Sequence, residues 1–374
     1  MLPTNRRCKM TETNLVDAAG AVIPAAKLEE FVKKVFRVVG VSEKDAQITA
    51  RVLVQADWRG IESHGVARLS RYITGIQNGL INPKTKLKLV KETKATAFFD
   101  AANGLGQVAG HQAMNYCIKK AKKSGAAWVA VRNSNHYGIA GYYSMLALKH
   151  NMIGISMTNS RPLCVPTYSR EAIIGTNPIS VAAPADREQP FVLDMATSVV
   201  PIGKIEVAKR KGASIPLGWA VDKTGQPTTD PAAVLEGGGV LPLGGTAEFS
   251  GYKGYGLSVM IDILCGVLTG ASFLSLVEKP VDGKPAPANL GHFFGAINIK
   301  SFRPLKEFKK TMDLFINILK NSAKAEGCNR IFIAGEKEFE MEESRRKNGI
   351  PLDEKTVSSL KDIRNKLGIK FLEF

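Results

Sequence analysis

Two short apolar runs, separated by a helix-like stretch, dominate the segment from residue 127 to residue 160. The first run covers 127–131 and stops at a polar turn that contains His136, and the second begins at Met152. A strand–helix–strand crossover makes its two strands parallel and brings their carboxyl ends to one edge of the sheet, where open α/β sheets bind ligands. We therefore expect His136 and Ser160 to face one crevice.

The position of His136 also indicates its chemistry. An imidazole titrates near neutral pH, so at a sheet edge it can exchange a proton with a substrate oxygen. A histidine of the core is more typical of a periodic element than of a polar turn.

The remaining pattern favours an α/β fold over a helical bundle. Strand-like runs cover 126–131, 152–158, 179–184 and 190–194, and helical runs alternate with them at 139–149, 198–212 and 254–270. The ends of the chain are helical at 25–58, 64–79, 304–325 and 352–367, with strands at 85–100. Ser42, three residues before Asp45, predicts a helix cap. We expect an ordered loop at 212–248 and an edge strand at HFFGAINI, residues 292–299.

Length and composition set the class of protein. With 374 residues, of which 44% are hydrophobic, the chain can build a full core and two lobes. We expect a helical, substrate and dimerisation domain at 1–120 plus 296–374, and a cofactor-binding domain at 121–295. Since no apolar run approaches the roughly 20 residues that span a bilayer, we expect a cytoplasmic protein without a membrane segment. Arg6, Arg7 and Lys9 leave a short targeting leader as the alternative.

Cysteine spacing and charge exclude further classes. Cys8, Cys117, Cys164, Cys265 and Cys328 form no CxxC pair, so they indicate reduced thiols and no metal site. The net charge of +17 comes partly from lysine clusters at 84–94, 119–123 and 204–211. Because these lysines alternate with apolar residues and the aromatic content is only 7%, we expect no nucleic-acid partner. The charge could steer a small carboxylate to its site.

One glycine pattern, GLGQVAG at residues 104–110, invites a dinucleotide-binding prediction. It follows a strand-like run and precedes a helical one, as the Rossmann fingerprint does. That fingerprint also requires an acid at the end of the next strand, and this strand ends at Arg132 instead. We interpret the glycines as a helix entry.

Several longer stretches are far more specific together than any one motif alone. They are GIESHGVARLSRY (60–72), SNHYGIAGYY (134–143), SMTNSRPLCVPT (156–167), IIGTNPISVAAP (173–184), FVLDMATSVVPIGKIEVAKRKG (191–212) and GYKGYGLSVMIDILCGVLTG (251–270). In these the chain resembles the malate/L-lactate dehydrogenase family of the second type. That family also contains ureidoglycolate and sulfolactate dehydrogenases and a Δ1-piperideine-2-carboxylate reductase. The resemblance runs from about residue 25 to about residue 370.

The resemblance implies a homodimeric NAD- or NADP-dependent oxidoreductase with a non-Rossmann fold, in which flanking helices surround a central cofactor-binding sheet. Its implied reaction passes a hydride between nicotinamide and the carbon next to a carboxylate. Such chemistry needs a proton acceptor on the substrate hydroxyl. We assign this role first to His136; His64 could take it instead, or relay the proton through Ser63 and Asp194.

The substrate is expected to be a small carboxylate, most simply a malate-like 2-hydroxy acid. Arg68 is the predicted clamp, because a guanidinium donates two parallel hydrogen bonds to a carboxylate. It lies four residues after His64, so both would project from one face of a helix over 64–77. Ser160 matches the substrate-contacting serine of the family. Arg161 would favour a second anionic group on the substrate if its side chain entered the pocket.

Cofactor contacts are expected in four stretches. The DMATS segment provides Asp194, Met195, Ala196 and Thr197, whose small residues and hydroxyls could admit a pyrophosphate and cap the next helix. Ala140 and Gly141 begin the helix after His136 and could act similarly. Lys253 and Gly254 lie in GYKGYG, and Gly335 and Glu336 match a family segment near the cofactor. His64 is also implied to lie beside the cofactor.

Other functions remain open alternatives. Ser63, His64 and Asp194 are the residue types of a hydrolase triad, but neighbouring residues rarely pair as nucleophile and base, and GxSxG is absent. His64, His136 and Asp194 could instead form a facial metal triad. The charge could serve a non-enzymatic nucleic-acid or surface binder. Within the family, the alternatives are reduction of a cyclic imine and oxidation of sulfolactate or ureidoglycolate.

Overall fold

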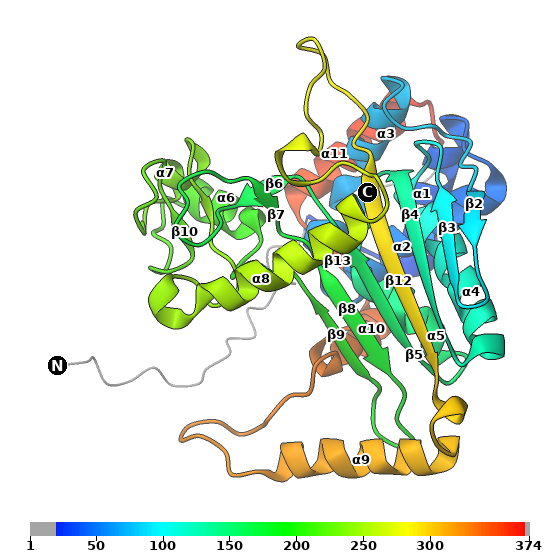
Figure 1. Cartoon of the computed structure of the whole chain (residues 1–374). Coiled ribbons are helices and arrows are strands. Elements are labelled where there is room, and N and C mark those ends of the chain that lie inside the picture. The colour runs from blue at the N-terminus through cyan, green and yellow to red at the C-terminus, as the bar shows by residue number, and fades with distance from the viewer. Residues whose placement is uncertain (1–19, 371–374) are drawn as a thin grey trace.

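A seven-stranded mixed sheet crosses the centre of the molecule (Figure 1). The computed structural model describes residues 20–370, so Arg6, Arg7, Cys8 and Lys9 lie outside the described residues. In spatial order the strands are β2 (Lys88–Glu92), β3 (Thr96–Asp100), β4 (Ala126–Ser134), β12 (Leu290–Asn298), β5 (Met152–Thr158), β8 (Ile179–Ala183) and β9 (Phe191–Met195). The mixed α/β architecture agrees with the prediction.

Strand β12 lies between β4 and β5 and is antiparallel to both. β4 and β5 therefore run in the same direction, as predicted, although they are not neighbours. The expected edge strand at 292–299 is wrong, because β12 is the central strand. Its successive Phe293 and Phe294 pack into cores on opposite faces of the sheet, which is the pattern of a strand buried on both faces.

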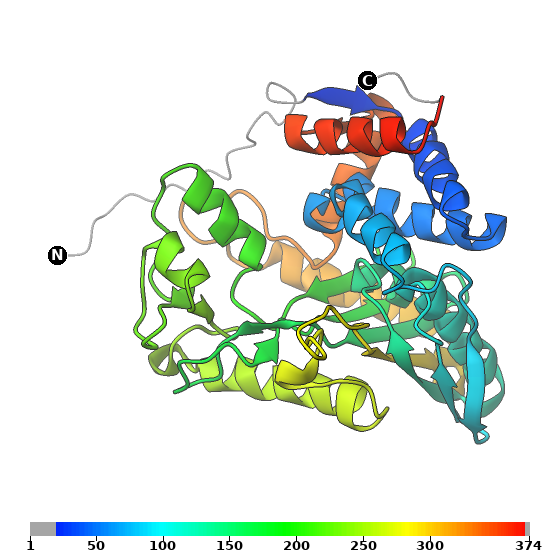
Figure 2. The same cartoon turned by 90° about the horizontal axis from the view of Figure 1, so that it is seen from above.

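Helices cover both faces of the sheet (Figure 2). On one face, α4 (Gly106–Ser124) and α5 (Ala140–Leu148) pack around Val129, Tyr143 and Phe294. On the other, α8 (Gly251–Asp262) and the π-helical turn Ile263–Val267 pack around Met157 and Cys265. The π turn extends α8 to nearly the predicted end at residue 270.

A second helical layer lies beyond α4 and α5. It contains α1 (Ala25–Val38), α2 (Glu43–Trp58), α3 (Leu69–Gln77), α10 (Glu336–Asn348) and α11 (Glu354–Lys366), with β1 (Ala21–Ile23) paired to β13 (Ile350–Leu352). Ser42 Oγ accepts a hydrogen bond from Asp45 N–H at 3.2 Å, which confirms the predicted cap. The sequence did not predict α10.

The prediction of one long loop at 212–248 is wrong, because this segment forms part of a small lobe. β10 (Ala220–Val221), α7 (Pro231–Leu235) and β11 (Gly239–Val240) lie within this range. The two strands join β6 (Pro162–Cys164) and β7 (Ile174–Gly175) in a four-stranded sheet, and α6 (Ile202–Arg210) packs on its core. Figure 1 shows this lobe beside the central sheet. Strands of two residues are too short to show the alternation that predicts a strand.

Three further expectations concern the whole chain. The central sheet combines β2 and β3, which precede the expected domain boundary at residue 120, with β4, which follows it. The two-domain division itself stays a prediction. Among residues 20–370, no disulfide joins Cys117, Cys164, Cys265 or Cys328. Within residues 20–370, no helix is long and apolar enough to cross a bilayer.

The GLGQVAG glycines serve packing in this fold. α4 begins at Gly106, where a Cβ would lie 2.0 Å from the carbonyl oxygen of Asn135. A Cβ at Gly110 would lie 2.7 Å from the Tyr143 ring. Both glycines therefore let α4 approach its neighbours closely, as the interpretation of a helix entry requires.

Candidate active site

A buried carboxyl group, that of Asp57, fixes the loop that carries Ser63 and His64 by a hydrogen bond. Asp57 accepts a hydrogen bond from Val66 N–H at 2.8 Å, and a Cβ at Gly65 would lie 1.9 Å from its Oδ1. Only glycine fits there. Arg345 of α10 donates to the Asp57 carbonyl and to the Glu62 carboxylate. The loop therefore has one defined geometry.

His64 of this loop stacks on a second histidine, His136. The His64 and His136 rings stack with centroids 5.6 Å apart and an interplanar angle of 24°. Ser63 Oγ lies 2.8 Å from His64 Nδ1, and the Tyr72 hydroxyl lies 2.6 Å from His136 Nδ1. Gly138 N–H also donates to His136 Nδ1, at 3.3 Å. Because Nδ1 is occupied, Nε2 is the nitrogen of His136 that can face a ligand.

Burial keeps both imidazoles neutral. It lowers the pKa of His64 to about 4, with the charges of Arg68 and Arg71 acting in the same direction. Burial also lowers the pKa of His136 well below its usual value, again assisted by Arg71, His64 and Arg68. The same cause raises the pKa of Tyr72 to about 12. Near pH 7 the histidines are therefore in the form that accepts a proton.

Arg68 lies beside this pair, but not on the helix expected over 64–77. The residues Glu62–His64 and Val66–Arg68 form two 3₁₀ turns, and α3 begins only at Leu69. Gly65 interrupts the helix, so that prediction is wrong. Arg68 Nε donates to the Ser63 carbonyl at 2.7 Å, and its terminal nitrogens are the part that can pair with a carboxylate.

Sequence reasoning missed Tyr72 and Arg71. Tyr72 is 1% exposed, and its hydroxyl group contacts His136 Nδ1. It lies four residues after Arg68, so helical spacing could have placed it near the site. Nothing in the sequence pattern distinguishes Arg71 from the other arginines.

Ser160 lies just beyond the end of β5. Its N–H donates to Asn177 Oδ1 at 3.0 Å, and its Oγ accepts from Thr176 N–H at 3.1 Å. The hydroxyl hydrogen can still be donated to a ligand. Arg161 is exposed, so its place next to Ser160 gives no argument for a second anionic group on the substrate. That Ser160 shares one crevice with His136 stays a prediction.

A pocket of about 270 Å³ is lined by Ile61, three residues before His64, and by Gly141, five residues after His136. Its lining includes the predicted residues Gly141, Asp194 and Gly335, together with Lys337 and Glu338. Gly141 N–H donates to Asp194 Oδ2 at 2.7 Å. Although Asp194 is exposed on the pocket wall, desolvation by the surrounding protein outweighs that hydrogen bond and raises the pKa of its carboxyl group to about 6. An open pocket with a carboxylate on its wall fits the ribose hydroxyls of a dinucleotide.

The other predicted cofactor residues lie outside that lining. Thr197 Oγ1 donates to the carbonyl groups of Thr176 and Asn177, and α6 begins at Ile202 without a side-chain cap, so the expected cap is wrong. Ala140 starts α5 and is buried, and Met195 and Ala196 follow Asp194 at the end of β9. Lys253 and Gly254 lie in the first turn of α8; Lys253 is exposed, and Gly254 packs against the Leu243 backbone.

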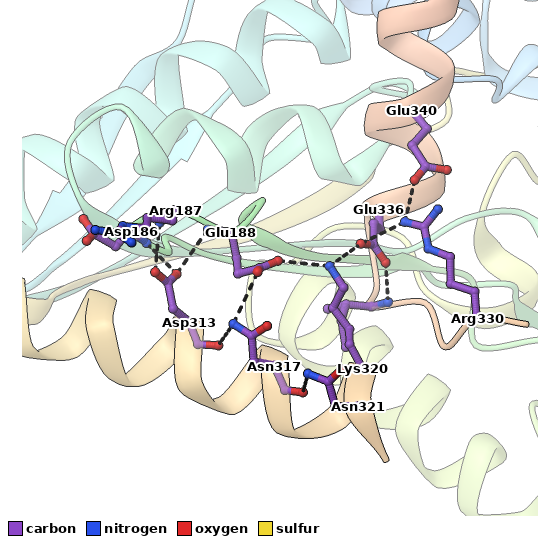
Figure 3. Close-up of polar contacts among 11 residues, drawn as sticks. Asp186, Arg187, Glu188, Asp313, Asn317, Lys320, Asn321, Arg330, Glu336 and Glu340 are labelled. Atoms are coloured by element: carbon purple, nitrogen blue, oxygen red, sulfur yellow. Dashed lines mark hydrogen bonds and ion pairs between the residues drawn. The ribbon is translucent and has the colours of Figure 1, made fainter. Parts of the chain in front are cut away.

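Glu336 does not line the pocket, and its carboxylate forms ion pairs instead. Its carboxylate pairs with Lys320 at 2.9 Å and Arg330 at 3.0 Å, and accepts from Ile333 N–H at 3.1 Å. Figure 3 shows the continuation of this network, in which Lys320 also pairs with Glu188 at 3.0 Å. The network fixes the segment that leads to Gly335 on the pocket wall.

The alternative site chemistries gain little from this geometry. Ser63 does contact His64, contrary to expectation, but no hydrogen bond among residues 20–370 joins either residue to Asp194. A relay through Ser63 and Asp194 stays a prediction. Those same residues contain no group of three potential ligands that could hold a metal ion.

A neutral imidazole pair flanked by guanidinium groups suits an enzyme that moves protons on small anionic substrates. The chain belongs to the malate/L-lactate dehydrogenase family, whose model matches residues 23–361. It is therefore a hydroxy acid dehydrogenase acting on CH–OH, with a nicotinamide cofactor. The resemblance in sequence and the expected fold are both confirmed.

Three relatives illustrate the match. Malate dehydrogenase of Pyrococcus abyssi is 50% identical over 365 residues, which are 97% of this chain and 100% of that protein. L-sulfolactate dehydrogenase of Methanocaldococcus jannaschii is 45% identical over 340 residues, 91% of this chain and 95% of that one. The crystal structure of malate dehydrogenase from Entamoeba histolytica superposes with a TM-score of 0.90 at 39% identity, covering 95% of this chain and 99% of that one.

Proposed function

We propose that this chain interconverts a malate-like 2-hydroxy acid and its 2-oxo acid, with His136 as the acid-base group. The single observation that carries the assignment is the contact between Tyr72 and His136 Nδ1, because it leaves Nε2 free to meet the substrate oxygen. The 50%-identical relative, which is named a malate dehydrogenase, supports the choice of substrate.

In oxidation, His136 Nε2 accepts the proton of the substrate hydroxyl in the tautomer that carries its hydrogen on Nδ1, where Nδ1–H donates to the Tyr72 hydroxyl; this tautomer gives up the longer, 3.3 Å contact with Gly138 N–H. Tyr72 can donate to Nδ1 or accept from it, so it keeps the ring oriented in both directions of the reaction. The terminal nitrogens of Arg68 pair with the carboxylate next to the reacting carbon, and Ser160 donates its hydroxyl hydrogen to the substrate. A bound nicotinamide supplies the hydride acceptor.

The pocket beside the histidines is proposed to hold the cofactor. Asp194 would accept hydrogen bonds from ribose hydroxyls, and Gly335, where a Cβ would lie 2.8 Å from Val192 Cβ, lets the pocket wall pack closely on β9. Lys337 could offset phosphate charge. Either NAD or NADP is compatible with this mixture of Lys337 and Glu338. His64, stacked on His136, would lie between cofactor and substrate.

Sulfolactate is the second candidate substrate, supported by the 45%-identical relative that is named a sulfolactate dehydrogenase. A sulfonate carries the same kind of distal negative charge as the second carboxylate of malate. Ureidoglycolate and a cyclic imine remain further alternatives in the family. We also propose, from the family resemblance, that the chain acts as a homodimer; the cytoplasmic location expected from the sequence stays a proposal.

The test is a spectrophotometric screen of malate, lactate, sulfolactate, ureidoglycolate and Δ1-piperideine-2-carboxylate with both dinucleotides. We expect malate to be among the best substrates. His136→Ala should lower kcat about 100- to 10,000-fold, which is the usual contribution of a general base. Arg68→Ala should raise the KM of the acid about 10- to 100-fold, the value of a charge-assisted hydrogen bond.

His64→Ala is the matched comparison. An undiminished kcat in His136→Ala, with activity lost in His64→Ala, would move the acid-base role to His64. A wild-type protein that is inactive with every acid and both dinucleotides would contradict the proposed function.

A further inference from the structure

His292 occupies the central strand of the sheet, between the two strands that lead to the proposed site. On one side of β12 it lies opposite Thr158 of β5, and on the other opposite Val131 of β4. A β-bulge separates the Leu290 and His292 positions on the β4 side. The side chain is 0% exposed, and none of the proposed chemical steps uses it.

Both ring nitrogens of His292 meet hydroxyl groups at the ends of these strands. Nδ1 lies 2.8 Å from Thr158 Oγ1, and Nε2 lies 2.8 Å from Ser134 Oγ. Ser134 precedes His136 by two residues, and Thr158 precedes Ser160 by two residues. One imidazole therefore connects the bases of the two loops that carry proposed site residues.

The hydrogen positions in this connection follow from its surroundings. Thr158 Oγ1 also lies 3.0 Å from the carbonyl oxygens of Asn159 and Gly291, which can only accept. The threonine hydrogen is therefore directed to a carbonyl, and its oxygen accepts from His292 Nδ1–H. Nε2 then accepts from the Ser134 hydroxyl. Burial lowers the pKa of His292 to about 3, so the ring stays neutral.

The ring makes a third contact with the loop of the acid-base histidine. His292 stacks on Tyr137 with centroids 4.7 Å apart and an interplanar angle of 8°. Tyr137 follows His136 directly and is itself fixed by Ser156, whose Oγ lies 3.1 Å from its hydroxyl. The orientation of His136 is thus supported from the sheet as well as from α3.

We propose that His292 is a positioning residue of the dehydrogenase reaction, whose hydrogen bonds and ring stack hold the His136 loop and the Ser160 loop at a fixed separation. The inference rests on the proposed function, because it takes His136 as the proton acceptor and Ser160 as a substrate contact. Loss of the connection acts on kcat, since misplacing reacting groups by about 1 Å costs about 100-fold.

Three substitutions test the connection. Ser134→Ala and Thr158→Val each remove one hydrogen bond and leave the ring in place, and His292→Phe keeps the aromatic stack but removes both bonds. We expect kcat with the 2-oxo acid to fall about tenfold in the first two and about 100-fold in His292→Phe, at an unchanged KM for the dinucleotide. His292→Asn, whose amide can still donate to Thr158, should recover part of the loss.

Thr49→Val is the control, because it removes a fully buried hydroxyl from α2, outside the sheet, and should leave kcat unchanged. A folded His292→Phe with wild-type kcat would overturn the inference, as would variants with a lower Tm but full kcat. If His292→Phe fails to fold, Ser134→Ala and Thr158→Val decide between the same outcomes. A wild-type protein without dehydrogenase activity would instead overturn the proposed function, and the positioning role with it.

Discussion

At the scale of single residues, desolvation by the surrounding protein shifts the pKa values of the site more than neighbouring charges do. Desolvation is the largest cause of the lowered pKa of His64 and of the raised pKa of Asp194, and the nearby arginines come second or later. The same cause thus favours the neutral form of an imidazole and the protonated form of a carboxyl group. Near pH 7 this leaves His64 neutral and Asp194 ionised.

Asp194 gives the site a predictable pH dependence. Its ionised carboxylate accepts from Gly141 N–H and, as proposed, from ribose hydroxyls, so protonation weakens dinucleotide binding. Affinity should be constant above a pH of about 6 and fall by up to about tenfold per pH unit below it. Fluorescence titration of the oxidised dinucleotide across this range measures the effect. In Asp194→Asn the dependence should disappear, whereas equal wild-type affinity on both sides of the pKa would contradict the account.

Sequence reasoning reached the residues whose chemistry is visible in short motifs. It placed His64, His136 and Arg68 in one region, and the structure brings these three together. It could not reach His292, because that residue lies in an apolar strand whose partners, Ser134 and Thr158, are more than 130 positions away in the chain.

At the scale of elements, α10 and α9 (Leu305–Asn321) support the wall of the proposed cofactor pocket. α10 begins after Gly335, and its Glu342 pairs with Arg59 at 3.1 Å. On α9, Asp313 accepts hydrogen bonds from the backbone N–H groups of residues 186–188 at 2.9, 2.9 and 3.2 Å. Lys320 links the same helix to Glu188 and Glu336 (Figure 3). Through Asp313 and Lys320, α9 thus connects the β8–β9 turn to the start of α10.

Lys320→Met tests this connection between α9 and α10. Glu336 would keep Arg330 but lose its link to α9, and the segment leading to Gly335 would become more mobile. We expect the KM for the dinucleotide to rise several-fold while the KM for the acid stays nearly constant. Because the ion pairs are partly exposed, stability should fall by only about 1 kcal/mol or less.

Lys310→Met is the matched control on the same helix, since Lys310 is exposed and lies outside this network. Steady-state kinetics with each substrate varied in turn measures both constants. Equal changes in the two KM values, or no change in either, would show that α9 does not position the pocket wall.

Among the elements, those with a strong period were predictable from the sequence. The helices at 25–58, the strand pair at 85–100 and the crossover from β4 to β5 agree with prediction. α10 was missed because EKEFEMEESRRKN has almost no apolar face, and charged contacts such as Arg345 with Glu62 hold it instead. The place of β12 could not be predicted, because nothing local determines which strands a distant segment separates.

At the scale of the whole molecule, the excess of basic residues has structural explanations as well as a functional one. Lys88 and Lys91 lie on β2, the fully exposed edge strand of the central sheet, where charged side chains prevent pairing with another chain. Lys122 and Lys123 lie in the last turn of α4, where they complement the helix dipole. That the net charge of +17 also steers an anionic substrate to the site stays a prediction.

The central claim is that this molecule transfers a hydride directly from the carbon that bears the substrate hydroxyl to a nicotinamide. The most direct test uses malate deuterated at that carbon, with the oxidised dinucleotide and the wild-type protein, followed by NMR of the reduced dinucleotide. We predict deuterium at C4 of the nicotinamide ring, and none when His136→Ala replaces the wild type for the same short incubation. Reduced dinucleotide without the label, or no reduction at all, would contradict the account.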